Sequence, residues 1–412
     1  MKVKRTERIW IEPNENIKKL CHLSKNLYNE ANYIIRQEFF KNGKWIRYNE
    51  LDKLLKNSEN YKLLPTQTSQ QILMLLDKSW KSFFKTLKEW KKEPEKFNAR
   101  PKLPRYKKDN FLLIFTNQQA KIIDGKLKLP KKVGLEVRTR LNEVDLREVR
   151  IIPKGIGYVV EIVYDKEIEV TEKEKDRIAG IDFGTTNIVT IANNIGIKPI
   201  VVKDDGKGIK SINQFYFKEQ ARLRSIYDLQ KIKDGKKMRK LIDKHDRKVS
   251  DYTHKLSRFI VNWCVKHNIG KIVIGYNPNW KQSVNIGKQN NQIFTCIPYQ
   301  KIIQQIIYKS EEVGIEVELQ DESHTSKCSF LDNEPIEHHD IYMGKRIKRG
   351  LFRSANGIII NADVNASYNI IRKSEPKAFQ KWNADGVGGC LGLHPARLSE
   401  FDLLQSNKGL TC

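Results

Sequence analysis

Apolar residues at helical spacing dominate the first hundred residues after a short predicted strand at 3–10. Within 14–40 they recur every three or four positions, at Ile17, Leu20, Leu23, Leu27, Ala31 and Ile34. A second helix is predicted over Tyr48–Leu55. A third follows Pro65 and runs to about Lys92, with Thr66 or Thr68 as its N-cap. The pattern therefore predicts a helical unit over residues 11–99.

The period changes to two after about residue 100. Strands are predicted at 111–115, 121–129, 134–139, 147–152 and 157–164, where Gly, Pro and Asn separate the apolar runs. Because another strand precedes the helices, residues 1–10 and 100–172 together predict a small β-barrel that the helical unit interrupts.

A second pattern begins after the charged linker "DKEIEVTEKEKDR". Residues 178–194 predict a strand hairpin around Gly-Thr-Thr-Asn, and 211–268 a long helical region. A buried strand follows at 271–277, then a helix at 299–314 ending at Gly314 and a strand at 315–320. This order fits an RNase H-like α/β domain, so the predicted fold class is a multidomain α+β protein. The tail, 376–412, is predicted to be loosely ordered.

The net charge of the chain indicates what kind of partner it binds. The chain has 412 residues, with 76 Lys and Arg against 49 Asp and Glu, a net charge of +27. Residues 1–170 carry +15 of this and the remainder +12, so the excess covers both halves. Such a surplus is costly unless a polyanion offsets it, which favours nucleic-acid binding. The alternative is a Lys-rich surface of an AT-rich or thermophilic genome, but the acidic residues do not rise in step.

Composition excludes several other classes of protein. Hydrophobic residues make up 39% of the chain, enough for real cores and too many for a disordered polybasic tail. No apolar run approaches the roughly 18 residues that span a bilayer, and the N-terminus lacks a secretory apolar segment. Six Cys without a C-x-x-C pair predict reduced thiols. We expect a cytoplasmic, nucleoid-associated protein of a prokaryotic cell.

Three acidic residues are candidates for catalysis. RNase H-like domains hold two Mg²⁺ ions with carboxylates from separate strands and helices, because Mg²⁺ prefers hard oxygen ligands. The candidates are Asp182 in "GIDFGTT", Glu322 in "LQDESHTSK" and Asp363 in "NADVNASYNI". For Asp182 a turn-capping role is the alternative, since D-x-G occurs in many turns.

These motifs, with "KIVIGYNPNWKQ", "GKRIKRGLFRS" and the segment from "IPYQKIIQQ" to "CSFLD", resemble the TnpB (OrfB) proteins of insertion sequences. That family comprises RNA-guided DNA endonucleases related to type V CRISPR effectors. The resemblance implies a wedge β-barrel (1–10 plus 100–172) with an inserted helical recognition domain (11–99). It also implies a RuvC nuclease domain (176–320 and 363–375, with 211–268 helical and basic) and a zinc-ribbon-like insertion at 321–362.

The resemblance further implies partners and sites. The partners would be a guide RNA from the transposon end and double-stranded target DNA, with no membrane. Asp182, Glu322 and Asp363 would bind two Mg²⁺ ions. Lys41, Lys44 and Arg47 are predicted to contact DNA next to the target. Residues 211–250, with a net charge of +7, would line the guide–target duplex, with Lys236, Lys237 and Arg239 as candidate contacts. A solvated helix face is the alternative for this segment.

Two departures from the family pattern change these expectations. The strand that usually ends in the second acid reads "IVIGYN", with Gly275 in that place. We expect Glu322 to supply the missing carboxylate. Asp321 stays an alternative, because strand parity is ambiguous at a frayed end, and Glu322 could instead be a solvent-facing acid in a turn.

The second departure concerns zinc. Only Cys328 remains of the usual two C-x-x-C pairs, with His338 and His339 downstream. One Cys and two adjacent His are a poor tetrahedral set, so structural zinc is not expected and the insertion should be a metal-free loop.

Three functions remain open at this point. The leading one is a magnesium-dependent, RNA-guided DNA endonuclease of a transposable element. The second is an RNA-guided DNA-binding repressor that has lost cleavage. The third is a transposase or resolvase of RNase H-like fold that works without RNA. Copurifying RNA and plasmid cleavage would distinguish them.

Overall fold

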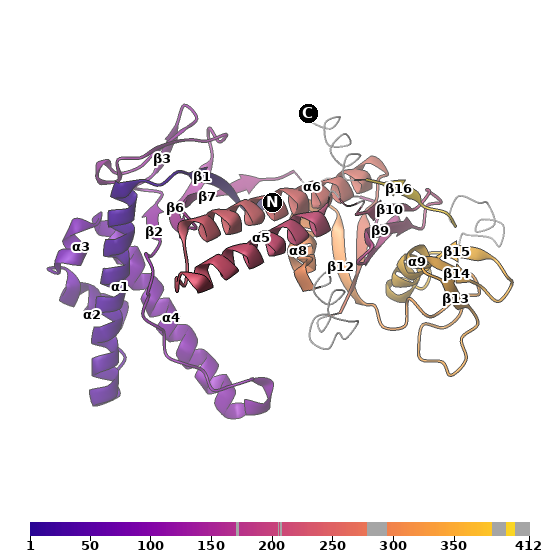
Figure 1. The fold of residues 1–412 in the computed structure, drawn as a ribbon, viewed down its shortest axis with the longest axis horizontal. Helices are drawn as coiled ribbons and strands as arrows, with labels where there is room; N and C mark the ends of the chain where they lie inside the picture. The colour runs from indigo at the N-terminus through magenta and orange to yellow at the C-terminus, as the bar shows by residue number, and fades with distance from the viewer. Residues whose placement is uncertain (170–172, 205, 207, 278–294, 381–392, 400–412) are drawn as a thin grey trace. The chain divides into compact units, whose positions relative to one another are not determined.

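The fold is a mixed α/β, multidomain one (Figure 1). The computed structural model describes residues 1–169, 173–204, 206, 208–277, 295–380 and 393–399. The chain divides into two compact units, Met1–Ile168 and Glu169–Cys412, and each has its own hydrophobic core.

Four helices follow the first strand in the first unit: α1 (Glu15–Asn42), α2 (Tyr48–Leu55), α3 (Glu59–Leu63) and α4 (Thr66–Lys92). Helix α1 begins at Asn14, whose side chain accepts a hydrogen bond from the Ile17 amide, and ends at Gly43 with a φ of 67°. The predicted helices are confirmed. The predicted cap of α4 is wrong, since Pro65 is its N-cap and Thr66 its first residue.

The strands of the first unit form two antiparallel sheets. The first has the order β1-β7-β6-β2: β1 (Lys2–Ile11), β7 (Gly157–Glu167), β6 (Asp145–Lys154) and β2 (Leu113–Thr116). The second contains β3 (Lys121–Ile123), β4 (Lys126–Lys128) and β5 (Glu136–Arg138). The single strand predicted at 121–129 is therefore two strands, because Asp124 and Gly125 both have positive φ and turn the chain back. The closed barrel stays a prediction.

The second unit is built on a six-stranded mixed sheet of order β12-β11-β8-β9-β10-β16. Its members are β8 (Ile178–Phe183), β9 (Asn187–Asn193), β10 (Ile200–Lys203), β11 (Lys271–Tyr276), β12 (Glu316–Asp321) and β16 (Ala396–Leu398). The predicted β8–β9 hairpin is confirmed. Strand β11 lies parallel to both β8 and β12, as expected where helices connect strands.

Helices cover the two faces of this sheet. On one face, Ala179 and Ile181 of β8 share a core with α6 (Lys236–Lys266) and α8 (Tyr299–Glu311). On the other face, Ile178 and Val273 pack against α9 (Ala362–Ser374). The helical region predicted over 211–268 is two helices, α5 (Ile209–Leu229) and α6, interrupted between residues 230 and 235.

A small three-stranded sheet lies in the 321–362 segment: β13 (Lys345–Lys348), β14 (Leu351–Arg353) and β15 (Ile359–Asn361). The sequence pattern missed these strands and also β10 and β16. The tail is not loosely ordered throughout, because Ala396–Leu398 pair with β10. The rest of the tail prediction at 381–392 and 400–412 lies outside the described residues. Among the described helices, none is long and apolar enough to cross a membrane.

Candidate active site

Strand alternation places Asp182 on the α9 face of the sheet. Neighbouring strand residues point to opposite faces, and Ala179, Ile181 and Phe183 belong to the core beneath α6 and α8. Ile178, on the same face as Asp182, packs under α9. Asp182 is therefore presented near the end of β8, half-buried, toward the N-terminus of α9.

Asp363 approaches from the first turn of α9. Asn361 caps the helix, and its side-chain oxygen accepts hydrogen bonds from the amides of Asp363 (3.0 Å) and Val364 (3.1 Å). The helix lies directly on β8 because Gly180 has no side chain. A Cβ atom there would lie 2.4 Å from the Ser367 carbonyl oxygen. This close packing brings the first turn of α9 to Asp182.

Glu322 arrives from the end of β12. In the register of β11 and β12, Gly275 is opposite Gln320, and Glu322 lies two residues further, on the same side of the strand. Its Oε2 atom lies 3.5 Å from the position that a Cβ atom of Gly275 would occupy. Asp321 instead forms an ion pair with Lys373 at 2.9 Å and accepts a hydrogen bond from the Ser323 hydroxyl. The carboxylate beside Gly275 thus belongs to Glu322.

The charges of two of the acids act on the third, Asp182. Burial, and then the charges of Asp363 and Glu322, raise the pKa of Asp182 well above its usual range, while Arg346 partly offsets the shift. Burial together with Asp182 and Glu322 also raises the pKa of the Tyr299 hydroxyl. The structure therefore brings all three predicted acids into one electrostatically coupled site.

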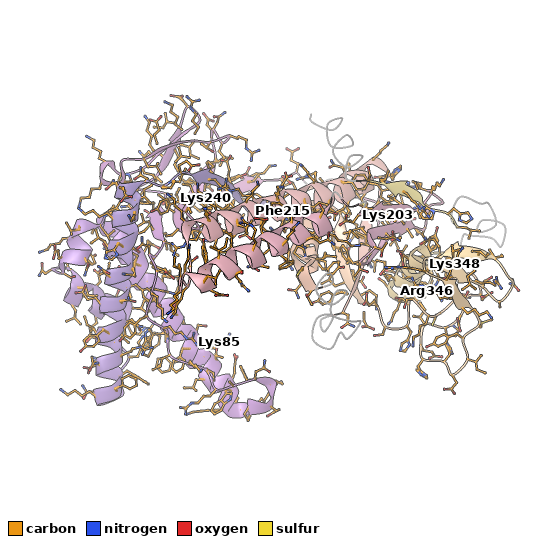
Figure 2. The ribbon with its side chains drawn as sticks, in the orientation of Figure 1. Lys85, Lys203, Phe215, Lys240, Arg346 and Lys348 are labelled. Carbon is orange, nitrogen blue, oxygen red and sulfur yellow. The ribbon has the colours of Figure 1, made fainter. Side chains whose placement is uncertain are left out.

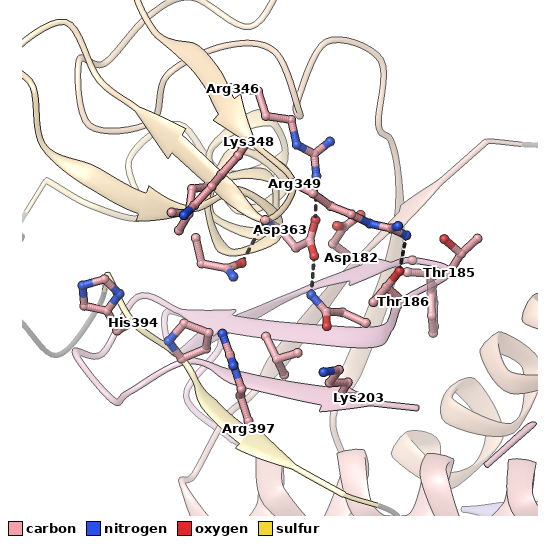
Figure 3. Close-up of a pocket in the computed structure, with 18 residues that line it drawn as sticks. Asp182, Thr185, Thr186, Lys203, Arg346, Lys348, Arg349, Asp363, His394 and Arg397 are labelled. Carbon is pink, nitrogen blue, oxygen red and sulfur yellow. Dashed lines mark hydrogen bonds and ion pairs between the residues drawn. The ribbon is translucent and has the colours of Figure 1, made fainter. Parts of the chain in front are cut away.

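Asp363 has two polar partners (Figure 3). The Asn187 side-chain amide donates to its Oδ2 at 2.6 Å, and the Arg346 guanidinium lies 3.7 Å from its Oδ1. As placed, no three His, Cys, Asp or Glu side chains in the described part of the chain stand close enough to hold a metal ion. The donor set itself, carboxylate oxygens from separate elements, fits Mg²⁺.

A cavity of about 1140 Å³ opens at Asp182 and Asp363 (Figure 3). Basic side chains from three segments line it: Lys203, Arg346, Lys348, Arg349, His394 and Arg397. The Arg349 guanidinium also donates to the Thr186 hydroxyl at 2.5 Å. Figure 2 shows Lys203, Arg346 and Lys348 in this part of the second unit. Acids at the base and cations around them suit a phosphodiester substrate.

Sequence reasoning missed this lining and the contact of Asn187 with Asp363. The motif "GKRIKRG" at 344–350 contained a signal for the cations, because it concentrates Arg and Lys ten residues before the motif "NADVN" that carries Asp363. No pattern pointed to Asn187, which reaches Asp363 only through the β8–β9 hairpin.

The structure places Lys41, Lys44 and Arg47 at and just after the end of α1, all exposed. Lys44 forms an ion pair with Glu50 at 2.9 Å. Arg47 pairs with Asp77 at 3.2 Å. Two of the three cations therefore already have acidic partners inside the helical unit, and their role in DNA binding stays a prediction.

Lys236, Lys237 and Arg239 occupy the first turn of α6, which contains no acidic residue. Positive side chains are unfavourable at a helix N-terminus, where backbone N–H groups already carry partial positive charge. Arg239 is offset by Asp234 at 2.7 Å. The lysines gather beside a site that favours anions, which supports the predicted phosphate contact without testing it.

Comparison with known proteins finds two family models that match parts of the chain. A model of the family OrfB_IS605, described as a probable transposase, matches residues 161–281. A model described as the TNB domain of Cas12f1-like proteins matches residues 299–370. The predicted resemblance to TnpB (OrfB) proteins is confirmed. The two matched ranges contain Asp182, Glu322 and Asp363.

Individual relatives extend the resemblance. A TnpB-like protein of Acidianus two-tailed virus is 25% identical over 418 residues, covering 90% of this chain and 87% of its own length. The CRISPR-associated endodeoxyribonuclease Cas12f1 of Sulfoacidibacillus thermotolerans is 31% identical over 228 residues, 52% of this chain and 49% of that protein. A structure of a Cas12f1–sgRNA–target DNA complex matches with 15% identity and a TM-score of 0.36, covering 91% of this chain and all of that one.

Proposed function

We propose that this chain is an RNA-guided, magnesium-dependent DNA endonuclease encoded by a transposable element, with a single RuvC-type active site. The observation that carries the proposal is the convergence of Asp182, Glu322 and Asp363 beside a cavity lined by cations. The relatives named as TnpB-like proteins and as an endodeoxyribonuclease support the same activity.

Asp182, Glu322 and Asp363 would hold two Mg²⁺ ions. When bound, such ions supply the positive charge that activates water and stabilises the leaving oxygen of a phosphodiester. The remaining work belongs to the chain. Asn187 orients Asp363 through their 2.6 Å hydrogen bond, and the cations of the cavity bind the strand by its phosphates.

The domain assignment belongs to the same proposal. Residues 1–10 and 100–172 serve as the wedge, 11–99 as the recognition domain, and 176–320 with 363–375 as the nuclease domain. Guide RNA from the transposon end and double-stranded target DNA are the partners. Base pairing would select the target, while the protein contacts the backbone and a short adjacent motif.

The cleavage-deficient repressor is the alternative with an observation behind it, namely Gly275 in place of an acid. The position of the Glu322 carboxylate favours the enzyme, because it lies beside the space that a side chain at Gly275 would occupy. For the RNA-independent transposase or resolvase, the deciding observation would be the absence of discrete RNA from the purified protein.

The test is cleavage of a plasmid by the protein purified with its RNA. Asp182→Ala and Asp363→Ala should each abolish cutting and leave guided DNA binding nearly intact, because binding depends on base pairing and phosphate contacts. Cleavage within about tenfold of wild type, ~1.4 kcal/mol of barrier, would contradict a ligand role for that residue.

A further inference from the structure

The 321–362 segment does not present a zinc site. The structure describes all residues of this segment. No three of the segment's His, Cys, Asp and Glu side chains lie close enough together to hold a metal ion. Its single thiol, Cys328, is buried and donates a hydrogen bond to the Glu337 carbonyl at 3.6 Å. His339 directs Nε2 to the Pro335 carbonyl at 2.8 Å. A structural zinc site needs four converging ligands, so these donors do not fit it.

A buried carboxylate, that of Glu334, joins two loops of the segment instead. Glu334 is only 2% exposed. Its two carboxylate oxygens accept hydrogen bonds from the backbone amides of Ser329 (2.6 Å) and Met343 (2.8 Å). Its carbonyl oxygen accepts from the Arg372 guanidinium of α9. Glu334 therefore links two nearby loop positions, Ser329 and Met343, to helix α9 through Arg372, as a metal ion links loops in a ribbon.

Two amides of α9 complete the attachment. Asn365 accepts from the Phe330 amide at 2.9 Å and donates to the Cys328 carbonyl at 2.9 Å. Asn369 donates to the carbonyls of Cys328 (2.7 Å) and Thr325 (2.9 Å). The backbone around Cys328 is thus held by hydrogen bonds to the same helix that carries Asp363.

The Glu334 contact reaches the cavity through β13. Met343 lies two residues before this strand, which carries Arg346 and Lys348 into the cavity. Fixing the Met343 amide fixes where the strand begins, and hence where the Arg346 guanidinium meets Asp363. Burying a carboxylate is costly unless hydrogen bonds satisfy it, so Glu334 has one stable arrangement.

We propose that Glu334 takes the place of zinc in this segment and is a positioning residue for Arg346. The part about Arg346 rests on the proposed nuclease function. The part about zinc does not, because it concerns only what holds residues 321–362 together.

Three measurements on the full-length protein test the proposal. Elemental analysis should find substoichiometric zinc, and Cys328→Ser should fold and cleave like wild type. In Glu334→Gln the amide group replaces one acceptor by a donor, so the Ser329 and Met343 amides should exchange hydrogen at least about tenfold faster. Glu337→Gln, an exposed acid in the same segment, is the matched control and should change neither amide.

The third measurement is a double-mutant cycle on cleavage. If Glu334 acts through Arg346, then Glu334→Gln combined with Arg346→Ala should cleave no more slowly than Arg346→Ala alone. Additive losses would overturn the positioning role. One zinc per chain that disappears in Cys328→Ser, or unchanged exchange at both amides in Glu334→Gln, would overturn the replacement of zinc. Should wild type not cleave at all, the nuclease proposal fails while the zinc and exchange results still stand.

Discussion

Residue by residue, the active-site carboxylates are defined by what surrounds them. Asp321 and Glu322 are adjacent and chemically alike, yet one is paired with Lys373 and the other influences the pKa of Asp182. A carboxylate neutralised by a lysine at 2.9 Å has little need of a second cation. The charge of Glu322 instead acts on Asp182, which places Glu322 with the active-site acids.

The first prediction follows from this difference. Glu322→Gln keeps the shape and removes the charge, so it should reduce cleavage by at least about a hundredfold, ~2.7 kcal/mol of barrier. Asp321→Asn, the matched control, should cleave at nearly the wild-type rate. Guided DNA binding, measured in parallel, should be unchanged in both. The reverse pattern would identify Asp321 as the ligand. Cleavage by both variants would contradict the hypothesis that either residue replaces the carboxylate missing at Gly275.

The second prediction concerns pH. Since the pKa of Asp182 is raised in the folded protein, the folded state binds more protons than the unfolded state above the ordinary Asp pKa of about 3.9. Its contribution to stability is therefore present at low pH and lost as pH rises toward the folded value. At higher pH the cost of burying this charge, or of keeping the group protonated, therefore opposes folding of the metal-free protein.

Asp182→Asn should accordingly stabilise the metal-free protein at about pH 8, with a gain that shrinks toward about pH 4. Urea unfolding in a chelator at both pH values measures this. Addition of Mg²⁺ should stabilise wild type and have much less effect on the variant, because binding to the folded state alone raises stability. An equal gain for Asp182→Asn at both pH values would show that ionisation of Asp182 is not the cause.

At the scale of elements, the site depends on how closely α9 lies on the sheet. Two glycines on that face permit it. A Cβ atom at Gly180 would lie 2.4 Å from the Ser367 carbonyl, which is backbone, whereas one at Gly275 would lie 2.6 Å from the terminal methyl of Ile370. Side chains rotate aside more easily than a helix backbone moves.

The third prediction is that Gly180→Ala destabilises the second unit by about 3 kcal/mol or more and Gly275→Ala by about 1 kcal/mol. Urea unfolding measures both. Gly180→Ala should also slow cleavage, because it pushes the first turn of α9, with Asp363, away from β8. If the two substitutions cost the same, the helix can shift freely and its position does not depend on Gly180.

Long elements were predictable from the sequence, and short ones were not. The 28 residues of α1 and the 27 of α4 repeat their apolar period several times. The 3-residue strands β14, β15 and β16 contain no full repeat, and they are defined by the strands that pair with them. The partner of β16, β10, is distant in sequence. The same holds for the site. Sequence motifs indicated Asp182 and Asp363, whereas the role of Asn187 depends on a contact that only the tertiary fold creates.

At the scale of the whole molecule, two units with separate cores share one excess of positive charge. Cations of each unit that contact the phosphates of a nucleic acid would release counterions from it. The salt dependence of binding can therefore be divided between the two units. The candidate cations differ in an important way. Lys44 and Arg47 must give up their pairs with Glu50 and Asp77 to contact a phosphate.

The fourth prediction compares the two groups by the slope of log K against log salt concentration. Each phosphate contact with duplex DNA contributes about 0.9 to that slope. Replacing Lys236, Lys237 and Arg239 by Ala should reduce it by about 2, because in the described part of the chain only Arg239 of this group has an acidic partner. Replacing Lys41, Lys44 and Arg47 should reduce it by about 1, since pairs within the protein already offset two of these charges. Filter binding of the RNA-loaded protein at several salt concentrations gives both slopes.

An unchanged slope in either triple variant would show that this group of cations is not part of the nucleic-acid interface. A larger change for the Lys41, Lys44 and Arg47 variant would mean that DNA breaks their ion pairs on binding.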